Sequence, residues 1–115
     1  MDLKIFHNPK CSKSRATLDL LKNRGLEPQI IEYLANPPTT LELRRLLDML
    51  AIQPRDFIRK KEAPYRDHLL DDDTLSDDVL IQAMVDNPIL IERPIVVSNG
   101  RAAIGRPPEN VLDIL

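Results

Sequence analysis

The sequence predicts a small α/β domain in which helices cover a mixed four-stranded sheet, with a helical insert between the strands. Three observations support this fold class. A β-α-β pattern opens the chain, a helical stripe of leucines occupies its middle, and an Asn-Gly turn joins two β-rich runs near its end. A length of 115 residues is typical of one domain, so we expect a single domain over residues 1–115.

The first three elements follow from changes of pattern along the chain. Leu3–Phe6 is a short, mostly apolar run that stops at Asn8-Pro9, which is typical of a strand. From Ser12 the apolar residues recur at helical spacing as far as Gly25, a stop signal. Pro28–Tyr33 is rich in β-forming residues. Together these segments form a βαβ unit, whose strands should be parallel and joined by a right-handed crossover.

Two helices are predicted in the middle of the chain. Thr39 and Glu42 have the spacing of a capping box. The leucines that follow stand at i, i+3, i+4 and i+7, namely Leu43, Leu46, Leu47 and Leu50. A second apolar stripe begins after Ser76 and ends at Asn87-Pro88. Short helical turns are expected in the polar stretch Gln53–Asp73 between these helices.

A hairpin and a helix are predicted for the last third. Pro94–Val97 and Ala102–Ile104 are β-rich, and Asn99-Gly100 between them favours a type I′ turn. Pro107-Pro108 should begin a final helix. Its apolar residues are Val111, Leu112 and Leu115.

Composition narrows the class of protein. Sixteen Lys and Arg against eighteen Asp and Glu give a net charge of −2, which argues against a general nucleic-acid binder. No apolar run reaches the ~18 residues of a membrane span. The apolar N-terminal run is broken too early to be a signal peptide. We therefore expect a cytoplasmic protein with neither a nucleic-acid nor a membrane partner.

The single cysteine, Cys11, excludes a disulfide within the chain. It directly precedes the first predicted helix, whose free N–H groups and positive dipole end stabilise a thiolate. Lys10, Lys13 and Arg15 add positive charge. A buried, inert side chain is the commoner fate of a lone cysteine, but these polar and basic neighbours favour a reactive thiol.

The residues after Cys11 exclude two kinds of thiol site. Ser14 gives a C-x-x-S pattern, so no dithiol can cycle within the chain. Thr17 stands six positions after Cys11, where phosphatase-type loops have an arginine. An oxyanion would therefore need arginines from elsewhere, because guanidinium groups match oxyanion geometry. The candidates are Arg59, Arg93 and Arg106. A lone arginine is usually a solvated surface residue, so their convergence on the thiol is open at this point.

Histidine and acidic residues do not form a metal-ligand pattern. His7 is a candidate to orient the thiol, or else a structural hydrogen-bonding group. The only other histidine is His68, so a metal site built on histidine is not expected. Asp71–Asp73 lacks EF-hand spacing and is interpreted as a solvated face or a helix cap.

Several separate motifs, in order along the whole chain, resemble the glutaredoxin-linked arsenate reductase (ArsC) family and within it the short YfgD-like branch. They are His7–Arg15, Tyr33–Pro38, Arg59-Lys60, Glu62–Tyr65, Asn87–Val97 and Arg106–Glu109. The better-known members often have Gly after the nucleophile, where this chain has Ser12, and they have a longer C-terminal tail.

The resemblance implies a thioredoxin-like fold and a cysteine thiolate, here Cys11, that attacks arsenate. It implies that Arg59, Arg93 and Arg106 hold the oxyanion. The supporting residues it implies are His7, Ser14, Arg15 and Pro94, the last in a cis peptide bond. No bound cofactor or metal is implied, and glutathione and glutaredoxin would be the external reductants and partners.

Two other functions compete with arsenate reduction. One is a regulator like the Spx proteins, which bind RNA polymerase and typically use a C-x-x-C switch. Ser14 argues against that switch, and the three arginines favour a small anion. The other is a glutathione-dependent thiol enzyme with a different substrate.

Overall fold

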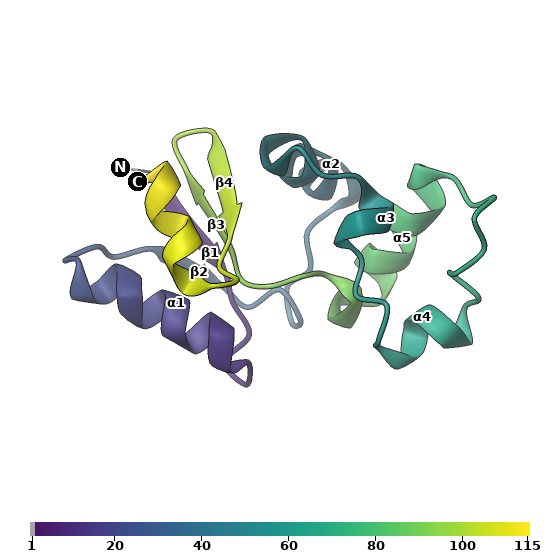
Figure 1. Ribbon diagram of the computed structural model, residues 1–115, viewed down its shortest axis with the longest axis horizontal. Coiled ribbons are helices and arrows are strands. Elements are labelled where there is room, and N and C mark those ends of the chain that lie inside the picture. Colours follow the sequence, from purple (N-terminus) through teal and green to yellow (C-terminus); the bar gives the residue numbers. More distant parts are fainter. Residues whose placement is uncertain (1) are drawn as a thin grey trace. The chain divides into compact units, whose positions relative to one another are not determined.

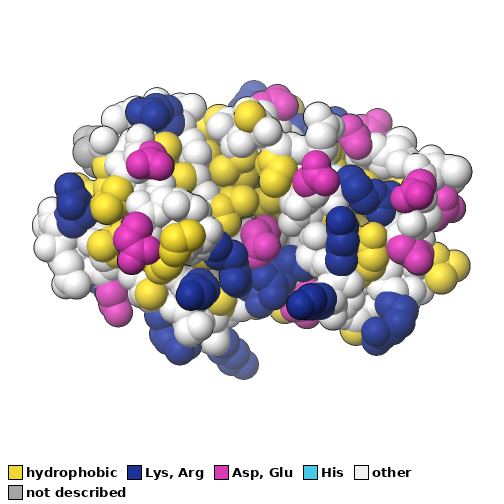
Figure 2. All heavy atoms as spheres, in the orientation of Figure 1, with side chains coloured by type: hydrophobic (Ala, Val, Ile, Leu, Met, Phe, Trp, Pro, Cys, Tyr) yellow, Lys and Arg dark blue, Asp and Glu magenta, His cyan; other side chains and the backbone are white. Residues whose placement is uncertain are grey.

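The computed structural model describes residues 2–115, and its chain divides into two compact units (Figure 1). The first unit holds the residues up to Asn36 together with Arg93–Leu115, and the second holds Pro37–Glu92. Lys and Arg side chains are interspersed with Asp and Glu on the visible face of each unit (Figure 2), as the small net charge would suggest. In the described part of the chain, no helix is long and apolar enough to cross a membrane.

The first unit is built on a four-stranded sheet with strand order β2-β1-β3-β4. Its elements are β1 (Leu3–Phe6), α1 (Ser12–Asn23), β2 (Gln29–Ile31), β3 (Ile95–Ser98), β4 (Arg101–Ile104) and a 3₁₀ helix, η2 (Pro108–Ile114). β1 pairs with β2 in parallel and with β3 antiparallel. The mixed sheet and the parallel first pair are confirmed, and the architecture is thioredoxin-like.

The hairpin between β3 and β4 has the turn that its sequence predicts. Asn99 and Gly100 both have positive φ, at 51° and 80°, as a type I′ turn requires. Ser98 pairs with Arg101 at the end of the antiparallel ladder. The turn thereby fixes the register of β4 and the point at which the chain leaves it.

The core of the first unit is aliphatic. Side chains from the sheet meet those of α1 and η2 in one buried cluster, formed by Leu3, Ile5, Leu21, Val96, Val111 and Ile114. This packing holds α1 against the sheet, and with it the loop that connects β1 to α1.

The second unit is helical and lies in the sequence between β2 and β3. Its elements are α2 (Thr40–Leu50), α3 (Pro54–Phe57), α4 (Ala63–Asp67), α5 (Asp77–Asp86) and a 3₁₀ turn, η1 (Pro88–Leu90). The Thr39–Glu42 capping box is present in both directions, and the Ser76 hydroxyl accepts from the Val79 N–H. The helical insert and its short central turns are therefore confirmed.

Two expectations differ from the structure in detail. The expected terminal helix is present as a 3₁₀ helix, but Ile114 is buried with Val111 while Leu112 and Leu115 are only partly covered. The second strand is three residues long instead of the six of Pro28–Tyr33, because the chain turns immediately after Ile31. The expectation of one domain over residues 1–115 stays a prediction.

Candidate active site

Cys11 lies at the start of α1, directly after the loop that leaves β1. It is the N-cap residue of the helix, with extended backbone angles (φ −93°, ψ 124°). Its N–H donates to the Asn8 carbonyl at 3.0 Å, and its carbonyl accepts the first helical hydrogen bond from Arg15. The residue is half-buried.

The surroundings of the sulfur favour the thiolate. Burial by itself raises the pKa of the Cys11 thiol, but the backbone N–H groups of Ser14 and Lys13 and the Arg93 side chain together lower it below its usual value. The Cys11 side chain makes no capping hydrogen bond to the helix. The predicted reactive thiol thus has a physical basis in the fold.

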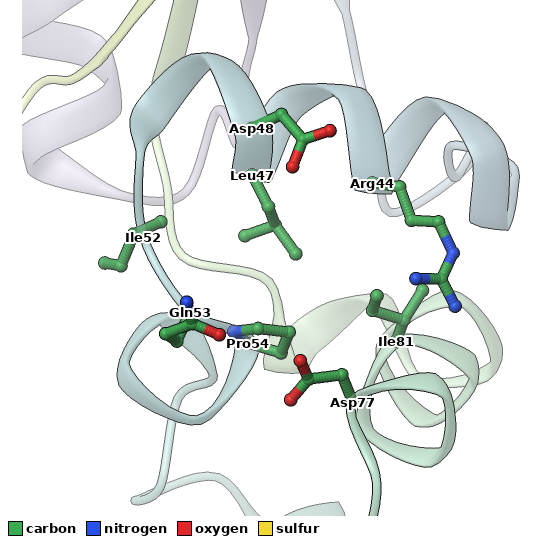
Figure 3. Close-up of a pocket in the computed structure, with 8 residues that line it drawn as sticks. All are labelled: Arg44, Leu47, Asp48, Ile52, Gln53, Pro54, Asp77 and Ile81. Carbon is green, nitrogen blue, oxygen red and sulfur yellow. The ribbon is translucent and has the colours of Figure 1, made fainter.

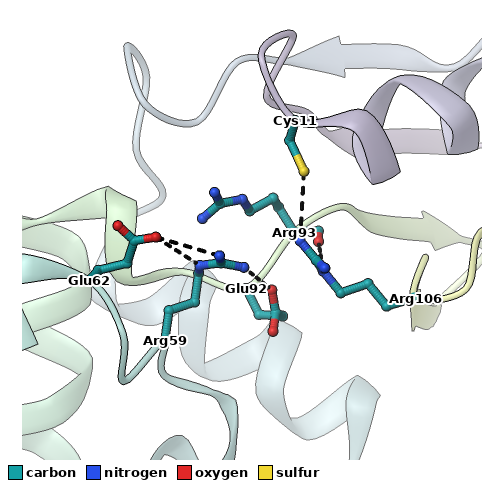
Figure 4. Close-up of polar contacts among 6 residues, drawn as sticks. All are labelled: Cys11, Arg59, Glu62, Glu92, Arg93 and Arg106. Atoms are coloured by element: carbon teal, nitrogen blue, oxygen red, sulfur yellow. Dashed lines mark hydrogen bonds and ion pairs between the residues drawn. The ribbon is translucent and has the colours of Figure 1, made fainter.

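Two of the three candidate arginines lie beside this sulfur in the first unit (Figure 4). The Arg106 Nη2 is 3.6 Å from the Cys11 Sγ, and the Arg106 Nε donates to the Arg93 carbonyl at 2.8 Å. Arg93 is 8% exposed, which is low for a guanidinium side chain. The sheet therefore brings positive charge from positions more than 80 residues away along the chain to the thiol.

Both arginines precede prolines in cis peptide bonds. The Arg93–Pro94 bond is cis, as the resemblance implies. The Arg106–Pro107 bond is also cis, which the sequence analysis did not anticipate.

His7 and Ser14 form a buried polar pair behind the thiol loop. The His7 Nδ1 and the Ser14 Oγ are 2.6 Å apart, and the same hydroxyl accepts from the Asn8 N–H at 3.0 Å. Burial lowers the pKa of His7, Glu32 opposes this shift, and the charges of Lys22 and Arg15 add to it. The pair therefore fixes the loop on one side while the Ser14 backbone N–H acts on the sulfur.

The Arg15 side chain supports the loop by a hydrogen bond to the backbone of the loop. Its Nη1 donates to the Pro9 carbonyl at 3.0 Å, and the side chain is exposed. Asn8 is named in the sequence analysis only as a stop signal and as part of a family motif, not as a site residue. Its side-chain oxygen accepts from the Lys10 N–H at 3.0 Å. The Asn-Pro dipeptide is the signal that could have drawn attention to it, because such dipeptides initiate turns.

Arg59, the third candidate, belongs to the second unit. Its Nη1 is 2.7 Å from the Glu92 Oε1, and its Nη2 is 3.5 Å from the Glu62 Oε1. It lines a surface pocket with its neighbours Lys60 and Lys61. Two carboxylates thus hold this guanidinium in place, and its approach to the thiol stays a prediction.

A second surface pocket of the same unit lies among α2, α3 and α5 (Figure 3). Its lining residues are Arg44, Leu47, Asp48, Ile52, Gln53, Pro54, Asp77 and Ile81. It includes none of the predicted site residues. Among residues 2–115, no group of three or more His, Cys, Asp or Glu side chains is placed to hold a metal ion.

Comparison with known proteins gives one consistent result. A sequence model of the ArsC family matches residues 6–114. The chain is 55% identical over 114 residues to the uncharacterized protein YfgD of Escherichia coli (strain K12), covering 98% of this chain and 96% of that protein. It is 45% identical over 115 residues to an arsenate reductase of Neisseria meningitidis serogroup B (strain MC58), covering 99% and 98% of the two chains.

A solved structure agrees with these sequence relatives. The arsenate reductase from Vibrio cholerae superposes with a TM-score of 0.97 at 54% identity, covering 100% of this chain and 98% of that one.

Proposed function

The chain belongs to the ArsC family, and from this premise we propose that it reduces arsenate to arsenite, with Cys11 as the nucleophile and external thiols as the reductant. The observation that carries the proposal is the distance of 3.6 Å between the Arg106 Nη2 and the Cys11 Sγ. It puts a nucleophilic sulfur and an oxyanion-binding group side by side, and arsenate is a substrate that needs both.

The first step uses the thiolate. Cys11 Sγ attacks arsenic, an S–As bond forms, one As–O bond breaks, and that oxygen leaves as water after taking up protons. Arsenic stays pentavalent in this adduct. The lowered pKa of the Cys11 thiol raises the fraction of the nucleophile that is deprotonated, which is the state that reacts.

The arginines make this attack possible electrostatically. An anionic nucleophile and an anionic substrate repel one another, and guanidinium groups fixed in advance lower the energy of the adduct-forming transition state. Arg93 and Arg106 supply this charge in the first unit. Arg59 is proposed as the third group, on the strength of its match to the family motif.

The reducing electrons come from outside the chain, because Cys11 is its only cysteine. Two external thiols give up two electrons and two protons and become one disulfide. One thiol replaces a hydroxyl on the arsenic of the adduct, and that hydroxyl leaves as water. The second thiol attacks the sulfur of the first, so the disulfide leaves and arsenic becomes trivalent. Water then cleaves the S–As bond, which frees the Cys11 thiol and arsenite, and overall arsenate loses one oxygen as water, so atoms and electrons balance. Glutathione, followed by glutaredoxin, is the proposed source, and a thiol maintained in this way suits the reducing cytoplasm.

An activity assay with arsenate, glutathione and glutaredoxin tests the proposal. We expect arsenite release from the native protein and none above the background without enzyme from Cys11→Ser. The background without glutaredoxin shows whether that partner is needed. Arsenite release at the native rate from Cys11→Ser would refute the mechanism. A native protein with a reactive Cys11 but no arsenite release would instead indicate a different substrate.

A further inference from the structure

Gly105 stands where the chain leaving β4 crosses α1 in close contact. A Cβ atom at this position would lie 2.4 Å from the Thr17 Oγ1, 2.8 Å from the Pro94 Cγ and 3.1 Å from the Thr17 Cγ2. Atoms in van der Waals contact are about 3.5–4.0 Å apart. The other two glycines, Gly25 and Gly100, have positive φ and open space around them. Gly105 is therefore required for a close approach rather than for a turn.

The two neighbours of Gly105 have little freedom to move. Thr17 is fully buried, and its Oγ1 donates to the Lys13 carbonyl at 2.8 Å, which fixes its rotamer. Pro94 is a buried ring whose carbonyl accepts from the Gly105 N–H at 3.0 Å. A methyl group on Gly105 would thus be accommodated mainly by moving the backbone of residues 104–106 by about 1 Å.

The residue that such a movement would displace is Arg106. Its Nη2 is already 3.6 Å from the Cys11 Sγ, at the long end for an N–H···S contact, and its Nε is 2.8 Å from the Arg93 carbonyl. Both contacts, drawn in Figure 4, hold Arg106 at the thiol site, and their lengths therefore depend on where the chain passes α1.

We propose that Gly105 is a positioning residue for the thiol site. The missing side chain lets the end of β4 close onto α1 at Thr17, and this close approach sets the distance at which Arg106 meets Cys11. The consequence for arsenate binding rests on the proposed function, but the consequence for the thiol itself does not.

The test is the pH dependence of Cys11 alkylation by iodoacetamide. In Gly105→Ala we expect the midpoint to move up by about one pH unit, the order of one lost hydrogen bond to a charged group. The KM for arsenate should rise about tenfold for the same reason. Gly100→Ala is the matched control, because it strains a positive φ and meets no atom within 4 Å. It should lower stability and leave the alkylation midpoint unchanged.

Two double variants separate positioning from a general loss of stability. Adding Thr17→Ala removes both of the Thr17 atoms that the new methyl group meets, and it should bring the midpoint at least halfway back. Adding Thr17→Ser keeps the closer atom, Oγ1, and should not. If Gly105→Ala alone fails to fold, the two double variants still test the proposal. The double variant with Thr17→Ala must then fold and must have a low alkylation midpoint. Equal behaviour of the two double variants overturns the proposal.

A variant that lacks Arg106 tests whether Gly105 acts on the thiol through Arg106. In Arg106→Ala the Gly105→Ala change should add less than about a third of the midpoint shift that it causes in the native chain, because the group it positions is gone. Full additivity would overturn the proposal. These alkylation readouts need no arsenate turnover, so they remain decisive even if the proposed function is wrong.

Discussion

Arg106 shows at the residue scale how one side chain can serve two purposes. One nitrogen of its planar fork donates to the Arg93 carbonyl while another faces the sulfur, and its own carbonyl accepts from Asn110. The side chain is therefore ordered before any anion arrives. Lysine, with a single ammonium group on a flexible stem, cannot reproduce both contacts.

Substitution of Arg106 should weaken substrate binding in a graded way. We expect Arg106→Ala to raise the KM for arsenate about tenfold or more, and Arg106→Lys to recover only part of that loss, because one of two charge-assisted contacts is missing. Steady-state kinetics measures both. Arg101, exposed on β4, supplies the control, and Arg101→Ala should leave the KM unchanged. If Arg106→Ala has the KM of the native protein, Arg106 does not bind the substrate.

His7 should make the stability of the protein depend on pH. Its folded-state pKa is lowered, mainly by burial, so the unfolded chain takes up a proton first as the pH falls. The stabilising contribution is complete above the ordinary histidine pKa of about 6.5 and is lost as the pH falls toward the folded-state value.

Urea unfolding at pH 7.5 and 5.5 measures this effect. The loss of unfolding free energy on acidification should be smaller in His7→Asn than in the native protein. In His68→Gln, which changes an exposed histidine, the loss of unfolding free energy should equal that of the native protein. An equal loss in all three proteins would contradict the assignment to His7.

At the scale of single elements, the local sequence determines where helices begin. Thr39 accepts from the Glu42 N–H at 3.1 Å, and Glu42 accepts from the Thr39 N–H at 3.2 Å. Both contacts lie within four residues, so they depend little on the rest of the fold. This is why the spacing of Thr39 and Glu42 in the sequence was enough to predict the capping box.

Removal of this cap should destabilise the second unit. Thr39→Ala is expected to cost about 1 kcal/mol of unfolding free energy, since two helix N-terminal N–H groups lose their partners or their geometry. Denaturant unfolding followed by circular dichroism provides the measurement. Thr40→Ala, one position later and without a capping contact, should be neutral or slightly stabilising. Equal losses in the two variants would argue against the capping box as the cause.

Arg55 ties α3 to α4 and to the segment that follows α4. Its guanidinium donates to the Tyr65 hydroxyl, the Leu70 carbonyl and the Asp72 carbonyl. In Arg55→Ala we expect the Leu70 amide, which is bonded to the Tyr65 carbonyl, to exchange with solvent at least about tenfold faster. Hydrogen exchange by NMR tests this. Arg66→Ala, at an exposed position on α4, is the control and should leave that amide protected.

The errors of sequence analysis also belong to the element scale. Pro107-Pro108 correctly marked a helix start, but which apolar residues of that helix are buried depends on how its seven residues fit against the sheet. Gly105 carried no signal at all, because its neighbour Thr17 is 88 positions away in the sequence. Contacts between such distant residues are set by tertiary packing, which no local pattern encodes.

At the scale of the molecule, the thiol and two of its arginines come from opposite ends of the chain. Cys11 follows β1, Arg93 precedes β3 and Arg106 follows β4, so the pairing of β3 with both β1 and β4 brings them together. The family motifs identified these residues in the sequence. The distances, the ordering of Arg106 and the second cis bond depend on strand pairing and needed the structure.

One cysteine per chain predicts a simple stoichiometry. With excess oxidised glutathione the native protein should gain one glutathione per molecule, and Cys11→Ser should gain none. Intact-mass spectrometry reads this directly, and glutaredoxin with reduced glutathione should reverse it. A disulfide-linked dimer as the main product would show that Cys11 of a second molecule, rather than glutathione, is the preferred partner.

The position of Cys11 at the N-cap couples the chemistry of the sulfur to the folding of the chain. The backbone N–H groups of Ser14 and Lys13 stabilise the thiolate, and by the same interaction the thiolate stabilises the beginning of α1. Any step that neutralises the sulfur removes this stabilisation of the start of α1. We expect the alkylated protein to melt below the unmodified protein at pH 8. Through this one helix end, each turnover would carry the protein through a less stable covalent state and back.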